Sequence, residues 1–111
     1  MPRYLISFDD GTMNIPEAEL PAVGEAAHEV VRAAQAAGVW VFGGGVIPGA
    51  SIVATDGTVA IGPSPETKTV IGGFSIVDVP SHDDAIEWAA KFAVACRCAQ
   101  EVRELMFDPE V

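Results

Sequence analysis

Three short segments carry apolar residues on both faces of a predicted strand. They are Arg3–Phe8, Val39–Phe42 and the longer stretch Gly73–Val79, where successive side chains alternate between the two sides. A strand that is apolar on both sides needs a cover on each of them. The pattern therefore predicts a sheet with layers packed against both faces.

Two segments show helical periodicity instead. From about Glu17 to Ala37, apolar residues recur at steps of three and four, which gives one narrow stripe that ends before Gly38. A second helix is expected after Pro80, with Ser81 as its N-cap and acidic residues in its first turn. Its packed face is predicted to hold Ala85, Ile86, Ala89 and Ala93, flanked by Trp88 and Phe92.

Glycine-containing segments mark the turns and irregularities. Asp56-Gly57 lies between Ser51–Thr55 and Thr58–Ile61 and predicts a hairpin whose two central residues both have positive φ. The run Gly43–Gly45 predicts a bulge, a bend or the close approach of another backbone or a ligand. Glu101–Phe107 is expected to form the last strand.

The order strand, helix, strand, hairpin, strand, helix, strand predicts an α+β fold of the split βαβ type with an inserted hairpin. We expect one domain over residues 1–111. Two helices are enough to cover one face of the sheet. The other face would stay apolar and exposed, so we expect a homodimer in which two sheets pack face to face.

The composition and charge of the chain limit the classes of partner that it can bind. Half of the 111 residues are hydrophobic, and the formal net charge is −10. Because the six basic residues are scattered, the chain lacks the clustered Lys and Arg that nucleic acid or an anionic membrane surface requires. The apolar run at the N-terminus is too short for a signal peptide or a membrane span, so we expect a soluble cytoplasmic protein. Cys96 and Cys98 are expected to be reduced thiols.

The best candidate for chemistry is His28, at the flank of the first helix's apolar stripe, because imidazole titrates near neutral pH and suits proton transfer. A histidine in that position is also typical of a surface or interface residue. Glu66 and Lys68 follow a rigid turn rich in proline and are candidates to orient a small polar ligand. Ser64 belongs to the same turn and joins them as a candidate. The alternative for Glu66 and Lys68 is a solvated ion pair.

Aromatic residues supply the apolar part of the candidate site. Trp40, Phe42 and Phe74 are expected either to line a pocket or to fill the core or an interface. Asp78 shares a strand face with Phe74 and Ile76, and is expected either to end the buried zone or to face His28. Neither Ser64 nor Ser81 has an evident triad partner, which disfavours nucleophilic catalysis.

Several short motifs occur in a specific order: Asp56-Gly57-Thr58-Val59, Gly62-Pro63, Glu66-Thr67-Lys68, Gly72-Gly73-Phe74, and Asp83-Asp84-Ala85-Ile86-Glu87-Trp88-Ala89. In these motifs the chain resembles the YCII-related proteins, and specifically their DGPF-domain branch. The resemblance implies a ferredoxin-like dimeric α/β barrel, and a catalytic role for a histidine of the first helix, near the position of His28. Ile61 and Ser64 replace the Asp and Phe from which the branch takes its name.

The leading hypothesis is a small homodimeric protein that binds a small organic ligand in a cleft of each protomer. It would use His28 as acid or base and require no metal or organic cofactor. The alternative is a non-catalytic regulatory or interaction module, because DGPF domains resemble accessory parts of transcription-initiation sigma-factor proteins. Its partner would then be a protein. The enzyme hypothesis predicts that His28 and a carboxylate line one enclosed pocket. The interaction module predicts that His28 points to bulk solvent and that the only concavity is shallow and apolar.

Overall fold

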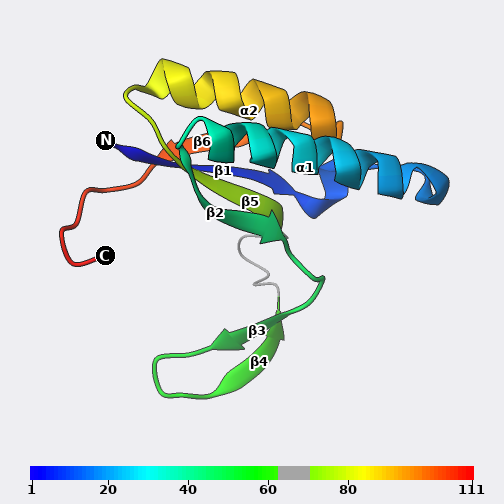
Figure 1. Ribbon diagram of the computed structural model, residues 1–111. Coiled ribbons are helices and arrows are strands. Elements are labelled where there is room, and N and C mark those ends of the chain that lie inside the picture. Colours follow the sequence, from blue (N-terminus) through cyan, green and yellow to red (C-terminus); the bar gives the residue numbers. More distant parts are fainter. Residues whose placement is uncertain (63–70) are drawn as a thin grey trace.

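The structure is a computed structural model that describes residues 1–62 and 71–111. Six strands and two α-helices make up the described part of the chain (Figure 1). Their bounds are β1 (Arg3–Asp9), α1 (Leu20–Ala36), β2 (Trp40–Gly45), β3 (Ala50–Val53), β4 (Val59–Gly62), β5 (Ile71–Asp78), α2 (His82–Cys96) and β6 (Glu101–Glu104). A short 3-10 helix, Glu17–Glu19, leads into α1.

The main sheet has the strand order β2-β5-β1-β6, and every neighbouring pair is antiparallel. Helix α1 connects β1 to β2, and β5 lies between these two strands in the sheet. Helix α2 connects β5 to β6, and β1 lies between those two. This interleaving of two βα units is the ferredoxin-like arrangement. The α+β fold predicted from the order of elements is confirmed.

Both helices cover the same face of the sheet (Figure 1). The core between the two layers is formed by helix-facing residues of β1 and β5, by Val79 just after β5 and by small residues of α2: Tyr4, Ile6, Val77, Val79, Ala85 and Ala89. Ser81 caps α2 as expected, with its hydroxyl 3.2 Å from the backbone nitrogen of Asp84. The prediction that Ile86 belongs to the packed face is wrong, since that residue is 44% exposed.

The second face of the sheet has no cover within the protomer. Alternation along β1 and β5 brings Leu5, Phe74 and Ile76 to this face, and the bulge in β2 between Trp40 and Phe42 brings Phe42 there as well. The rings of Phe42 and Phe74 are 6.0 Å apart. Phe42 is 63% exposed. We call these four residues the outer face, and they match the exposed apolar surface expected from the sequence.

Strands β3 and β4 pair with each other in a separate two-stranded sheet that projects from the rest of the molecule (Figure 1). The hairpin itself is confirmed, but the turn differs from the expected one because Gly57 has positive φ and Asp56 does not. The nitrogen of Gly57 donates to the carbonyl of Ala54, and the Asp56 carboxylate accepts from the backbone nitrogen and hydroxyl of Thr58. This turn is therefore a longer loop with glycine in its last position.

The last strand is shorter than predicted. It ends at Glu104, which pairs with Tyr4, and one further hydrogen bond joins the Leu105 nitrogen to the Arg3 carbonyl. Because β1 begins at Arg3, the neighbouring strand offers no pairing partner to residues beyond Leu105. Met106 and Phe107 consequently lie outside the sheet and are exposed.

Candidate functional site

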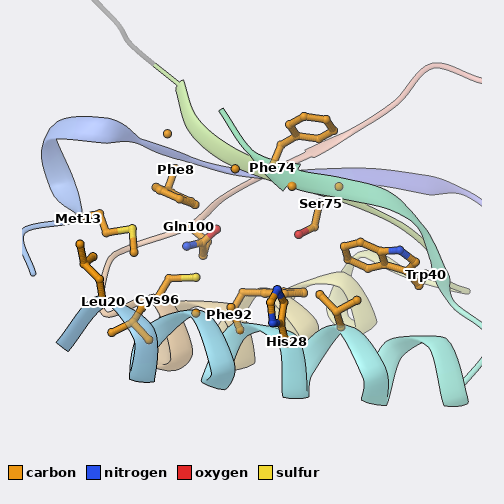
Figure 2. A pocket seen from close by; sticks show the side chains of 18 residues that line it. Phe8, Met13, Leu20, His28, Trp40, Phe74, Ser75, Phe92, Cys96 and Gln100 are labelled. Carbon is orange, nitrogen blue, oxygen red and sulfur yellow. The ribbon is translucent and has the colours of Figure 1, made fainter. Parts of the chain in front are cut away.

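A cavity of about 400 Å³ lies between α1 and the main sheet (Figure 2). It is bounded by one face of α1, by the end of α2 and by the glycine-rich parts of β2 and β5. The lining includes Gly24, His28, Trp40, Ser75, Cys96 and Gln100. Most of the surface is apolar, with a few polar groups that point inward, which is the composition of a small-molecule site.

The cavity exists because small residues face it. On α1, Gly24 and Ala27 lie one turn apart on the side that faces the sheet. A methyl group built on Gly24 would meet no atom within 4 Å. On the sheet side, Gly43–Gly45 contribute backbone but no side chains. Neither wall therefore fills the space between helix and sheet.

His28 lies on α1, and its imidazole points toward the sheet on the side of Ser75 and Trp40 (Figure 2). The residue is exposed to solvent while lining the cavity, so it occupies the rim. Among the lining residues that the structure describes there is no Asp or Glu. His28 can therefore exchange a proton with a ligand or form a hydrogen bond to it. In the described part of the site, no carboxylate orients the imidazole.

The three candidate aromatic residues divide between the two faces of the sheet. Trp40 lines the cavity and lies 6.2 Å from the ring of Phe92 on α2. Phe74 borders the cavity through its strand, but its ring points to the other side, toward Phe42 (Figure 2). The structure therefore brings Trp40 together with His28 and separates Phe42 from both.

Asp78 lies on the same side of β5 as Phe74 and Ile76, away from the cavity. Its carboxylate is 3.6 Å from the N-terminal amine and 3.6 Å from Nε of Arg3. Of the two alternatives for this residue, the structure places it at the end of the buried zone. Ser64, Glu66 and Lys68 lie outside the described residues.

Three polar residues in the cavity were not predicted as site residues from the sequence: Ser75, Cys96 and Gln100. Ser75 is 8% exposed and is a hydroxyl on the helix-facing side of β5, between the apolar Val77 and the glycine Gly73. A hydroxyl within the buried face of a strand is the signal that could have identified Ser75 as a site residue. Gln100 follows α2, and its side chain points into the cavity (Figure 2). Nothing in its sequence neighbourhood indicates this position.

Cys96 and Cys98 are both free thiols. Cys96 is the last residue of α2, and Cys98 follows two residues later. Burial raises the pKa of Cys96, and the nearby Cys98 raises it further. Burial also raises the pKa of Cys98, although a hydrogen bond with Thr12 opposes the shift. Because the folded protein favours the protonated thiols, stability should fall as the pH rises past the pKa of the unfolded thiols.

We expect both cysteines to react slowly with iodoacetamide at pH 7.5, because the thiolate is the reactive form. Cys96 is the more buried of the two and should react more slowly than Cys98. Trypsin cleaves at Arg97 and separates the two residues, so mass spectrometry of the peptides gives each rate. Alkylation of Cys96 as fast as that of glutathione would contradict the buried, protonated thiol.

Within residues 1–62 and 71–111, no three His, Cys, Asp or Glu side chains are grouped so as to hold a metal ion. The helices found in the same ranges are too short or too polar to cross a bilayer.

Comparison with known proteins adds to this geometry. No curated protein matches the chain in sequence. The family model for the YCII-related domain matches residues 4–106, which include β1 except for Arg3, all of β2 to β6, both helices and every cavity residue named above. The chain belongs to the YCII-related family.

Proposed function

We propose that this YCII-related domain binds a small organic ligand in the cavity between α1 and the sheet, with His28 donating or accepting a proton. The carrying observation is a cavity of about 400 Å³ that is mostly apolar and has an imidazole at its rim. Such volumes fall in the range of about 300–1,000 Å³ typical of ligand sites. The proposed site requires no metal or organic cofactor, and the proposed location of the protein is the cytoplasm.

The proposal includes a homodimer in which the outer faces of two protomers pack together. Its support is the uncovered set Leu5, Phe42, Phe74 and Ile76. The hairpin adds to it, since β3 and β4 contain no charged residue and Ile61 is 95% exposed. An isolated two-stranded hairpin is marginally stable in water, so this arm gains from packing against a second copy.

A thermal-shift screen of small organic compounds tests the ligand site, using the wild type, His28→Ala and Glu29→Ala. Glu29 neighbours His28 on α1 but borders the opposite groove between the two helices, so its variant is the matched control. A specific ligand at 100 times its Kd should stabilise the wild type by about 2.7 kcal/mol. The melting shift should shrink in His28→Ala and persist in Glu29→Ala.

Two results would contradict parts of this proposal. An unchanged shift in His28→Ala would remove His28 from the site. If no compound shifts the melting temperature, the alternative is favoured: a non-catalytic regulatory or interaction module that binds a transcription-initiation sigma-factor protein. The shallow apolar groove between α1 and α2, which includes Ala33 and Val94, is the surface that supports that alternative.

A further inference from the structure

The charge of the cavity lining limits which ligands it accepts. The described lining residues include no Lys, Arg, Asp or Glu. His28 is the single basic side chain among them, and it lies at the exposed rim. The Cys96 thiol stays neutral because burial raises its pKa. The interior therefore offers a charged ligand no ion of opposite sign.

A charged ligand would lose its hydration in this cavity without forming an ion pair, which is unfavourable. An anion would also be repelled by the protein as a whole, whose formal net charge is −10. An uncharged ring binds more favourably, because its apolar surface moves from water to the aromatic wall formed by Phe8, Trp40 and Phe92.

Polar groups remain available for a few hydrogen bonds. Ser75 presents its hydroxyl from the sheet, Gln100 presents a carboxamide from the end of the helix layer, and His28 lies across from Ser75 (Figure 2). Ser75 and His28 each offer a donor and an acceptor. The Gln100 amide nitrogen already donates to the Cys98 carbonyl at 3.4 Å, so the carboxamide oxygen and the second N–H remain for a ligand. Such an arrangement suits a ligand with one or two neutral polar substituents.

We propose that the ligand class of this cavity is an uncharged, mainly apolar ring compound with one or two hydrogen-bonding groups. This inference rests on the proposed ligand site and specifies its chemistry. It places the ring between α1 and the strands β2 and β5, and its polar substituent near Ser75 and Gln100.

Benzamide, benzoate and benzamidinium test the inference, since they share one shape and carry charges of 0, −1 and +1 at pH 7. Binding is measured by titration followed by NMR, which detects millimolar affinities. We expect benzamide to bind at least about tenfold more tightly than either ion. Ser75→Ala should weaken the binding of benzamide severalfold. The binding of toluene, which has no polar group, should stay unchanged.

A pair of α1 variants establishes where the probe binds. Gly24→Leu directs a large side chain into the cavity and should abolish benzamide binding. Ala33→Leu adds the same side chain on the opposite side of α1 and should leave binding unchanged. Gly24→Leu also replaces a glycine within a helix, a change that favours the helical state.

The outcomes separate this inference from the proposed function. Tighter binding of benzoate or benzamidinium, blocked by Gly24→Leu, would overturn the uncharged class while leaving the cavity as the ligand site. Benzamide binding that persists in Gly24→Leu, or no benzamide binding at 10 mM, would also overturn the inference. The broader thermal-shift screen then tests the ligand site independently.

Discussion

Phe42→Glu should convert the proposed dimer into monomers. Phe42 is 63% exposed in the protomer, so the new carboxylate is solvated in the monomer and the fold should persist. In a symmetric dimer the substituted position occurs twice, and each unpaired buried carboxylate costs several kcal/mol. Since every 1.4 kcal/mol is a factor of ten, the dimer Kd should rise by at least about a thousandfold. Sedimentation equilibrium measures this change.

The matched control is Val94→Glu, which introduces the same charge on the exposed side of α2. Val94 is 80% exposed and lies in the groove between the helices, on the side of the molecule opposite the outer face. Its Kd should stay within about threefold of the wild type. A wild-type particle of 11.6 kDa at micromolar concentration would overturn the dimer, as would equal Kd values for Phe42→Glu and Val94→Glu.

Gly43→Ala should destabilise the fold by about 1–3 kcal/mol, the range expected for overpacking a tightly filled position. A methyl group at Gly43 would lie 2.5 Å from the Phe74 carbonyl oxygen and 2.8 Å from the Cα of Ser75. Both atoms belong to the backbone of β5, so they can move only if the sheet itself shifts. Urea denaturation measures the loss as a lower transition midpoint.

Gly44→Ala provides the control, because a methyl group there meets no atom within 4 Å and the residue needs no positive φ. Its free energy of unfolding should stay within about 0.5 kcal/mol of the wild type. The two variants must be compared at one protein concentration, since dimerisation would add to stability. Equal midpoints for Gly43→Ala and Gly44→Ala would refute the close approach of β2 and β5.

The local elements were predictable because their signals lie within a few residues. Ser81 caps α2, as its position before Asp83 and Asp84 predicted. Helix α1 ends just before Gly38, which has φ +74°. The close backbone approach expected at the glycine run is found at Gly43. The errors at Ile86, at the Asp56 turn and at the end of β6 all concern which neighbours a residue meets in the folded chain.

The candidate site was only partly predictable for the same reason. His28 and Trp40 were selected by residue type, and the structure brings them to one cavity. Phe42 and Phe74 had the same aromatic character, but the bulge between Trp40 and Phe42 and the alternation of β5 turn their rings to the outer face. Ser75 and Gln100 join the cavity through pairing and packing that no local pattern encodes.

Periodicity and order of elements in the amino-acid sequence were sufficient for the α+β topology, because hydrophobic spacing dictates helix or strand and short connections leave few ways to assemble them. The location of the cavity was decided in three dimensions. It depends on the space that Gly24, Ala27 and the glycines of β2 leave unfilled between α1 and the sheet. These residues are distant in the chain and become neighbours only when the layers pack.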